Sequence, residues 1–438
     1  MRIKSVCFVL LAIGAAAAFA DPSVSITGVR AHYPWNGLVD IDYTIAGREG
    51  YDCDYQLKFS FGDTVAMNFL DWAWCDLPVA NGSYTVTWDS KADGVNAFLK
   101  GVTAKVELVQ DVVTEADADY LIVDVSSGSS SSEYPVRYAK APEGVTSAQF
   151  NKAIYKLDRI VLKRVKAGEF RMGNCNTETD TKNWHPVKLT KDYFLGVFEM
   201  TRKQYFNVMG AYELIWDKSK WIPAKCNNSV NSKVLDVEDP EKRPVGDLLF
   251  PVIEREETGV LAFLSSRAKC RGAEVTAFKL PTEAQWEHAC RAGTVTKYWW
   301  GEDTRTAAEE LKYEWTSFPP YPVDGNGGID SSHEVGTLLP NPWGFYDMGG
   351  NIVELCRDWY AAYTGKVTDV NPQLDPEGPN TGTTKVARGG GYYWRSMYDS
   401  ASGARVETKD LYNSSDYGGH LLASFGMRLC VTIPSAAE

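Results

Sequence analysis

The chain has 438 residues, and its 57 acidic side chains outnumber its 45 lysines and arginines, so the net charge is −12 at pH 7. Such a chain lacks the basic surface that displaces counterions from phosphates, so no nucleic acid and no anionic membrane is expected as a partner. After residue 20, no stretch approaches the roughly 18 apolar residues of a membrane-spanning helix, so no transmembrane segment is predicted.

Residues 1–20, MRIKSVCFVLLAIGAAAAFA, have the three parts of a secretory signal peptide. Arg2 and Lys4 give the positive start, residues 6–13 form the apolar run, and residues 18–20 provide a small-x-small cleavage site. A buried helix is the alternative interpretation. Cys7 lies inside the apolar run, so it is not expected to carry a lipid. We therefore predict a secreted or periplasmic protein.

Residues 21–125 are predicted to form an immunoglobulin-like β-sandwich. The stretch LVDIDYTI alternates apolar and polar residues, which is typical of a half-buried strand, with the apolar side formed by Val39, Ile41, Tyr43 and Ile45. YQLKFSF and GSYTVTWD repeat the pattern between turn residues. No catalytic motif is present, and the tryptophans are expected mainly in the core: Trp35, Trp72, Trp74 and Trp88.

Residues 126–165 are predicted to be a connecting segment that contains the domain boundary. SSGSSSSE at 126–133 has the composition of a flexible linker, and a helix or strand is expected around AIYKLDRIVLKRV. From 166 to 434 short apolar pieces alternate with Gly, Pro, Asn and Asp, which indicates a largely irregular second domain. The expected fold class is therefore α+β.

Two helices are predicted in this second domain. In LPTEAQWEHACRAG, Thr282 is expected to cap a helix that buries one face and ends at Gly293. In TRKQYFNVMG, Tyr205 and Val208 share a face and Gly210 ends the helix.

Several stretches of the second domain resemble the formylglycine-generating enzyme, or sulfatase-modifying factor, family, and they occur in the family's order. They are GEFRMG (168–173), HPVKLTKDYFLGVFEMT (185–201), KLPTEAQWEHACRAG (279–293), WWGED (299–303), PNPWGFYDMGGNIVEL (340–355), RDWY (357–360), ARGGGYYW (387–394) and FGMRL (425–429). The resemblance implies a compact fold related to C-type lectins, with few helices and short strands.

The same resemblance implies where catalytic residues would lie. The family's founding activity oxidises a substrate cysteine to formylglycine, using two cysteines that follow an RGGS motif and hold copper. Here the first position falls on Trp394 and the second on or near Asp399, and no cysteine occurs from Arg357 to Leu429. Soft thiolates are the ligands that Cu(I) needs, so no copper and no formylglycine-generating activity are expected.

One metal position is implied by the resemblance, a structural calcium in YDMGGNIVE. Its ligands would be the side chains of Asp347 and Glu354 and the backbone carbonyls of Gly350 and Ile352, which are the oxygen donors that Ca²⁺ takes. The alternative is that the two carboxylates only accept bonds from loop amides. A second family calcium site has no clear counterpart and stays open.

Eight cysteines remain after residue 20, and sequence alone does not choose among their 105 pairings. Cys53 and Cys75 flank the middle of the first domain and are one candidate pair. Cys290 and Cys430 lie close to a pair that the resemblance implies is disulfide-bonded, although Cys430 is one residue beyond the matching position.

The segment 391–420 is the candidate ligand-binding surface. Half of its thirty residues are Tyr, Ser, Gly or Asn, the types that recur in antibody paratopes. The candidate contact residues are Tyr392, Tyr393, Trp394, Arg395, Tyr398, Asp399, Asp416 and His420. The alternative is that Tyr392 and Trp394 fill the core and the rest is a turn-rich loop.

Three functional hypotheses follow. The first is an exported two-domain protein whose second domain binds a glycan, peptide or protein and has lost its enzymatic activity. The second is an oxygen-dependent metalloenzyme with a rebuilt site, which needs convergence among five histidines without metal-binding spacing: His32, His185, His288, His333 and His420. The third is a structural role in the cell envelope.

Overall fold

The structure is a computed structural model. It describes residues 22–34, 36–95, 104–173, 184–211, 214–217, 220–223, 239–246, 248, 253–254, 257–275, 277–301, 309, 311–315, 332–364, 370–392, 406–407 and 425–433. The signal peptide prediction therefore lies outside the described residues. No helix in these ranges is long and apolar enough to cross a membrane.

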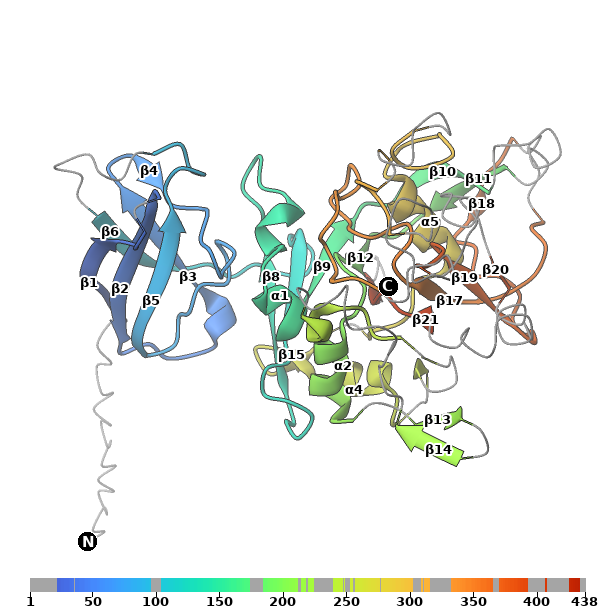
Figure 1. Ribbon diagram of the computed structural model, residues 1–438, viewed down its shortest axis with the longest axis horizontal. Coiled ribbons are helices and arrows are strands. Elements are labelled where there is room, and N and C mark those ends of the chain that lie inside the picture. Colours follow the sequence, from blue (N-terminus) through green and yellow to red (C-terminus); the bar gives the residue numbers. More distant parts are fainter. Residues whose placement is uncertain are drawn as a thin grey trace, which may run out of the picture.

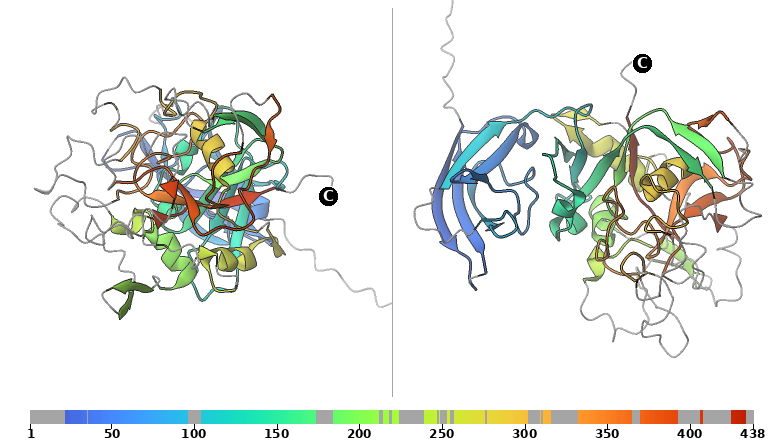
Figure 2. Two further views of the ribbon diagram at one scale, coloured as in Figure 1. Left: turned by 90° about the vertical axis from the view of Figure 1, so that its right-hand side faces the viewer. Right: turned by 90° about the horizontal axis from the view of Figure 1, so that it is seen from above.

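The N-terminal unit consists of two three-stranded antiparallel sheets and lies at one end of the molecule (Figures 1 and 2). The strands, in sheet order, are β1 (Ser23–Ala31), β2 (Leu38–Ala46) and β5 (Gly82–Asp89), then β4 (Thr64–Val65), β3 (Tyr55–Phe61) and β6 (Ala104–Gln110). The predicted alternation in β2 is confirmed, because Val39, Ile41, Tyr43 and Ile45 are all buried. They share one cluster with side chains of β3 and β5, such as Phe59 and Trp88. A two-sheet sandwich is thus present, while its immunoglobulin-type topology stays a prediction.

A seven-stranded sheet follows, and Figure 1 shows its strands between the N-terminal unit and the rest of the chain. Its order is β16 (Ala273–Glu274), β15 (Ala268–Cys270), β8 (Tyr134–Ala139), β7 (Tyr120–Asp124), β9 (Arg159–Val165), β12 (Tyr193–Gly196) and β22 (Cys430–Thr432). The predicted connecting segment 126–165 therefore needs correction. Its serine-rich part is the turn between β7 and β8, whereas the apolar runs beyond that turn form buried strands.

The C-terminal unit, from β7 onward, adds smaller sheets and short helices. The sheets are β20 (Val406–Glu407), β19 (Lys385–Arg388), β17 (Val353–Trp359) and β21 (Phe425–Gly426); β10 (Gly168–Met172), β11 (His185–Leu189) and β18 (Gln373–Leu374); and β13 (Leu214–Asp217) with β14 (Lys220–Pro223). Its described helices are α1 (Ile154–Leu157), α2 (Arg202–Met209), α4 (Val260–Arg267) and α5 (Glu283–Arg291), with 3₁₀ turns η2 (Ser147–Phe150) and η4 (Pro240–Lys242). The 3₁₀ turn η1 (Asp52–Asp54) belongs to the N-terminal unit. Short strands and few helices agree with the predicted texture.

Both predicted helices are confirmed, and each begins with a capping box. The Thr282 hydroxyl oxygen accepts a hydrogen bond from the Gln285 amide at 3.0 Å, and the Gln285 side-chain oxygen accepts one from the Thr282 amide at 2.9 Å. Thr201 and Gln204 make the same exchange at the start of α2, which ends at Gly210 in the left-handed region. Every residue of α5 is buried, so this helix lies inside the C-terminal unit and not on its surface.

The two units share a junction. Ala73 and Trp74 of the N-terminal unit pack in one apolar cluster with Tyr120 and Phe150 of the C-terminal unit. The Ala73 amide donates a 2.8 Å hydrogen bond to the Tyr155 hydroxyl. Of the tryptophans expected in the core, Trp74 and Trp88 are buried, Trp72 is partly buried, and Trp35 lies outside the described residues.

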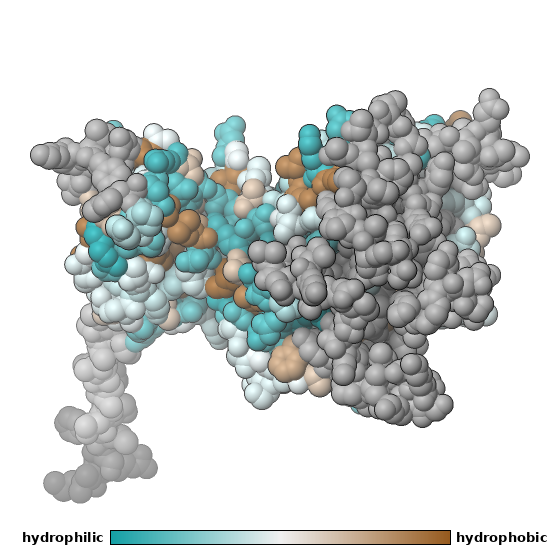
Figure 3. Space-filling view, viewed as in Figure 1, coloured by the Kyte–Doolittle hydropathy of each residue, from teal (hydrophilic) through white to brown (hydrophobic). Residues whose placement is uncertain are grey.

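On the face of the N-terminal unit seen in Figure 3, apolar residues are interspersed with polar ones. The exposed large apolar side chains of the N-terminal unit come from several different strands and loops, among them Val29, Tyr33, Val65 and Leu70. Scattered apolar residues of this kind are ordinary on a protein surface.

Candidate functional site

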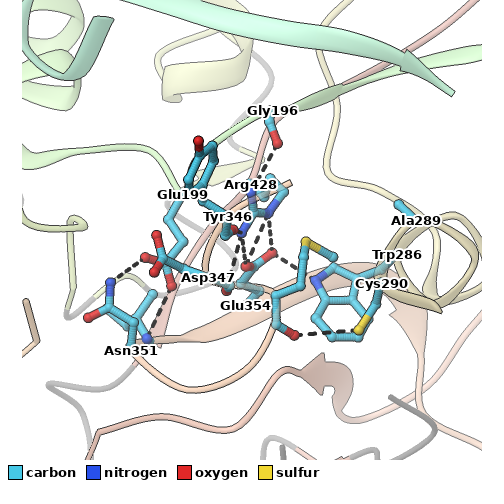
Figure 4. Close-up of polar contacts among 12 residues, drawn as sticks. Gly196, Glu199, Trp286, Ala289, Cys290, Tyr346, Asp347, Asn351, Glu354 and Arg428 are labelled. Atoms are coloured by element: carbon cyan, nitrogen blue, oxygen red, sulfur yellow. Dashed lines mark hydrogen bonds and ion pairs between the residues drawn. The ribbon is translucent and has the colours of Figure 1, made fainter. Parts of the chain in front are cut away.

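A buried arginine, Arg428, organises the centre of the C-terminal unit (Figure 4). Its guanidinium binds the Glu354 carboxylate, with Nη2 at 2.7 Å from Oε1 and Nε at 3.0 Å from Oε2. The remaining donors reach backbone carbonyls of Gly196 at 3.0 Å and Tyr346 at 2.9 Å. Burial alone would lower the pKa of Arg428, but Glu354 beside it raises that pKa above its ordinary value. Arg428 thus ties strands β12 and β17 to the loop before β17.

Two further carboxylates lie in the same region, Glu199 and Asp347. Glu199 accepts hydrogen bonds from the Asn351 side chain at 2.7 Å and from the Ile352 amide at 3.1 Å. Asp347 Oδ2 accepts a hydrogen bond from the Gly336 amide at 2.7 Å, while its Oδ1 is buried without a hydrogen-bond partner among the described residues. Burial raises the pKa of Glu199, and it raises the pKa of Asp347 to about 6. We call Glu199, Asp347, Glu354 and Arg428 the acid–arginine cluster.

The predicted calcium ligands lie together in the loop 347–354, and this loop is held tightly. Gly350 has φ +76°, and a Cβ there would lie 2.3 Å from the Trp315 carbonyl oxygen, so only glycine fits. The Asn351 amide donates to that carbonyl at 2.8 Å, and the Gly350 amide donates to the Gly389 carbonyl at 2.8 Å. The glycine-rich stretch at 389–391 therefore supports the loop directly.

The predicted calcium ligand set does not fit this geometry. Glu354 is occupied by Arg428 and by the Trp286 Nε1–H, which donates to Oε2 at 2.7 Å. A divalent cation at Glu354 would have to lie beside a buried guanidinium, and like charges repel strongly there. Within the described ranges, no group of three or more His, Cys, Asp or Glu side chains is arranged to hold a metal. Calcium in this loop stays a prediction, with the geometry against Glu354 as a ligand.

A second set of buried charges lies on α5. Arg388, at the end of β19, is fully buried, and it pairs with Glu287 and lies 3.4 Å from Glu283 Oε1. The Arg291 Nε–H donates to Glu287 at 2.8 Å, and Arg388 lies over the Trp286 ring at 5.1 Å. These contacts fix the strand that leads into the segment 391–420. We call Glu283, Glu287, Arg291 and Arg388 the helix α5 network.

Among the predicted ligand-binding residues, only Tyr392 is described. It is 3% exposed, and its amide donates to the Asn351 carbonyl at 3.0 Å. This position fits an anchor at the root of the segment and not a surface contact. The other candidates lie outside the described residues: Tyr393, Trp394, Arg395, Tyr398, Asp399, Asp416 and His420.

The described histidines do not converge. His32 lies on the N-terminal unit and bonds Asp40 at 2.8 Å. His185 packs against Tyr363, and His333 stacks on Trp315. His288 packs between aromatic rings on α5, and burial lowers its pKa to about 4, so it is neutral at pH 7.

The predicted cysteine pairs are not bonded in the structure. Cys290 and Cys430 both lie in the apolar cluster around α5 but are not bonded to each other, and Cys290 Sγ lies 3.5 Å from the Met348 carbonyl oxygen. Cys75 is buried at the junction, whereas the Cys53 sulfur lies beside Cys270. The spacing along the chain gave no indication of this, because Cys53 and Cys270 are 217 positions apart.

Sequence reasoning missed the roles of Glu199 and Arg428. Both are single charges inside apolar runs, LGVFEM and FGMRL, where nearly every neighbour is buried. A charged residue in such a run indicates a buried ion pair or hydrogen-bond network, since an unpaired buried charge is very costly. The sequence therefore indicated that each charge is buried and paired, but it did not indicate which residue is the partner.

Comparison with known proteins gives a consistent result. Residues 148–429 match the family described as "Sulfatase-modifying factor enzyme 1-like domain". The formylglycine-generating enzyme of Thermomonospora curvata is 33% identical over 121 residues, which are 27% of this chain and 40% of that enzyme. The enzyme of Streptomyces coelicolor is 34% identical over 162 residues, 36% of this chain and 50% of that enzyme.

The solved structure of Treponema denticola variable protein 1 has 24% identity and a TM-score of 0.45, and the match covers 63% of this chain and 96% of that one. The chain spans half or less of the length of the two curated enzymes named above.

Proposed function

The chain belongs to the sulfatase-modifying factor enzyme 1-like family, and from that premise we propose that it is an exported binding protein without formylglycine-generating activity. In this proposal the C-terminal unit presents the segment 391–420 to a glycan, peptide or protein. The acidic net charge of the whole chain makes nucleic acid an unfavourable partner.

The observation that carries the proposal is the composition of the chain between Arg357 and Leu429. This stretch contains no cysteine, although the family resemblance places the copper-binding pair after the RGGG motif. By this resemblance the first position falls on Trp394 and the second on or near Asp399. Indole is not an anionic ligand, and one carboxylate is a hard ligand, so the two do not replace a pair of soft thiolates.

The thiols nearest to this stretch support the same conclusion. Cys356 and Cys430 are buried on β17 and β22. Burial raises the pKa of Cys356 well above its ordinary value and that of Cys430 to about 12. Copper binding needs the thiolate, and burial disfavours the thiolate at both positions.

The base of the proposed binding segment supports a recognition role. Both flanks are buried, with Tyr392 on one side and Phe425 of β21 on the other. The sheet β20-β19-β17-β21 lies at this base, and Arg388 of its strand β19 binds Glu283 and Glu287 of α5. Loops on a rigid scaffold are the usual location of binding residues, and tyrosine and serine supply contact area and adaptable hydrogen bonds.

Binding is tested by screening the mature protein against arrays of glycans and peptides and then comparing variants for any ligand found. Trp394→Ala and Tyr398→Ala are expected to weaken binding at least about tenfold, since a central aromatic contact contributes about 2 kcal/mol or more. Tyr33→Ala is the matched control, because Tyr33 is an exposed aromatic on the N-terminal unit. Unchanged affinity in both test variants would contradict the proposed surface.

A direct activity test separates this proposal from enzymatic function. The purified chain is incubated with oxygen, Cu(I) and a cysteine-containing peptide, and peptide products are analysed by mass spectrometry. No conversion of cysteine to formylglycine is expected. Multiple turnovers in the wild type, abolished by boiling, would overturn the proposal.

A further inference from the structure

Two cysteines from the two units face each other at the junction. Cys53 lies in η1 of the N-terminal unit, and Cys270 ends strand β15 of the seven-stranded sheet. Their Sγ atoms are 3.9 Å apart. A disulfide bond needs about 2.0 Å between the sulfurs, so bond formation requires the two sulfur atoms to approach by roughly 2 Å.

The backbone on both sides of this pair is held in place. The Arg137 side chain on β8 donates to the Tyr55 carbonyl at 2.9 Å and to the Asp52 carbonyl at 2.6 Å. Strand β8 is also the neighbour of β15 in the sheet. On the other side, Arg271 forms an ion pair with Asp54. Arg137 and Arg271 both belong to the C-terminal unit and bind residues that flank Cys53. They therefore hold Cys53 next to Cys270.

The surroundings also favour thiol chemistry. The contact with Cys270 lowers the pKa of the Cys53 thiol to about 7, and the same contact raises the pKa of Cys270. Cys53 is partly exposed, whereas the described thiols of Cys75, Cys290, Cys356 and Cys430 are buried. A partly exposed thiolate beside a neutral thiol is the arrangement from which disulfide exchange starts.

We propose that Cys53 and Cys270 form a disulfide bond that covalently joins the N-terminal unit to the C-terminal unit. The oxidant is a low-molecular-weight disulfide such as glutathione disulfide. The Cys53 thiolate attacks one oxidant sulfur and releases one thiolate. Cys270 then loses its proton and attacks the mixed disulfide at Cys53, releasing the second thiolate. Two protein thiols are oxidised, and one oxidant disulfide is reduced to two thiols.

Cys53 also lines a cavity of about 200 Å³ at the junction, so the proposed bond would be part of the cavity wall. The lining also contains Arg137 and Arg159, which lie 3.6 Å and 3.4 Å from the Asp76 carboxylate. The disulfide fixes this cavity between the units. It also limits how far the sandwich can move from the C-terminal unit when the noncovalent contacts break.

Peptide mapping of the whole chain tests the bond. The folded protein is treated with glutathione disulfide, blocked with iodoacetamide and digested with trypsin without reduction. Cleavage after Arg48, Lys58, Lys269 and Arg271 leaves Cys53 in residues 49–58 and Cys270 in the dipeptide 270–271. We expect these two peptides as one cross-linked species that disappears on reduction.

Variants and controls make the outcome decisive. Cys53→Ser and Cys270→Ser are each expected to abolish the species, whereas Cys75→Ser, which changes a buried cysteine of the N-terminal unit, is expected to retain it. Because the cross-link is measured first on the wild type, the test does not depend on the folding of a variant. Carbamidomethylated Cys53 and Cys270, or glutathione left on Cys53 without a cross-link, would overturn the proposal.

Discussion

The two units of this chain fill their interiors with different kinds of side chain. The N-terminal unit buries an apolar cluster in which strands β2, β3 and β5 contribute alternate residues such as Ile41 and Phe59. The C-terminal unit has apolar clusters as well, but it also buries the acid–arginine cluster and the helix α5 network. The first kind of core tolerates graded change, while the second depends on each charge keeping its partner.

The two charged networks differ in balance. The helix α5 network has two arginines for two glutamates, whereas the acid–arginine cluster has one arginine for three carboxylates. In the latter, burial raises the pKa of Glu199 and Asp347. A surplus of carboxylates resembles a cation site, but Arg428 takes the position that a metal ion would need.

The largest effect is expected from Arg428→Met, which breaks the acid–arginine cluster. Glu354 would lose its counter-charge while buried beside Asp347 and Glu199, so the free energy of unfolding should fall by about 3–5 kcal/mol. Urea unfolding measures the change. Arg357→Met is the control, because the Arg357–Glu377 pair is partly exposed and should contribute at most about 1 kcal/mol. Equal losses in the two variants would contradict this account.

The next effect is a pH dependence from Asp358, which accepts the Glu283 amide at 2.9 Å near the helix α5 network. Burial, reinforced by Glu283, raises the pKa of Asp358 from 3.8 to about 7. Its protonation therefore favours the folded state below pH 3.8, and this contribution is lost as the pH rises to about 7.

Asp358→Asn removes this titration. The free energy of unfolding should then decrease by roughly 2–4 kcal/mol less between about pH 4 and pH 7 than it does in the wild type. Thermal melts of wild type and variant across that range provide the measurement. Parallel pH profiles for the two proteins would show that Asp358 ionises normally.

A smaller effect separates two buried tryptophans. Trp286 donates from Nε1 to the fully buried Glu354, and Trp88 donates from Nε1 to Asp93 at 2.6 Å, where the carboxylate is partly exposed. Replacement by Phe removes each bond, but water can hydrate only Asp93 afterwards. Trp286→Phe should therefore cost about 1 kcal/mol more than Trp88→Phe in urea unfolding. A larger loss in Trp88→Phe than in Trp286→Phe would contradict the claim that the C-terminal unit depends more on buried polar partners.

The smallest effect is expected from Ile41→Val in the N-terminal core. Ile41 is fully buried, and loss of one methylene should cost about 1 kcal/mol. Hydrogen exchange followed by mass spectrometry reads the N-terminal unit separately and should show faster exchange in β2 and its neighbours alone. A comparable acceleration in β17 or α5 would mean that the two units unfold together.

The sequence predicted the N-terminal strands and the two capped helices because local rules determine them. Alternation in β2 and the Thr-x-x-Gln capping boxes depend on residues within a few positions of one another. The strands of the N-terminal unit could therefore be predicted without knowing which strands pair with one another. The connecting segment was misplaced because the linker-like composition at 126–133 belongs to a turn between two strands of one sheet.

The site was much less accessible from the sequence. Glu354 was visible as an acidic residue of a glycine-rich loop, but its partner Arg428 is 74 positions away. Whether a carboxylate binds a metal or an arginine depends on which group the fold brings to it. The same limitation applied to Cys53, whose neighbour Cys270 belongs to the other unit. Only the three-dimensional arrangement distinguishes these alternatives.

The metal content of the mature protein tests the central claim most directly. The protein is purified from an oxidising compartment without chelator and analysed by elemental mass spectrometry, with protein quantified by amino-acid analysis. A chain without copper-binding thiolates in its C-terminal unit is predicted to contain neither copper nor iron in stoichiometric amount. About one tightly held copper or iron ion per chain would contradict the claim and indicate a metalloenzyme.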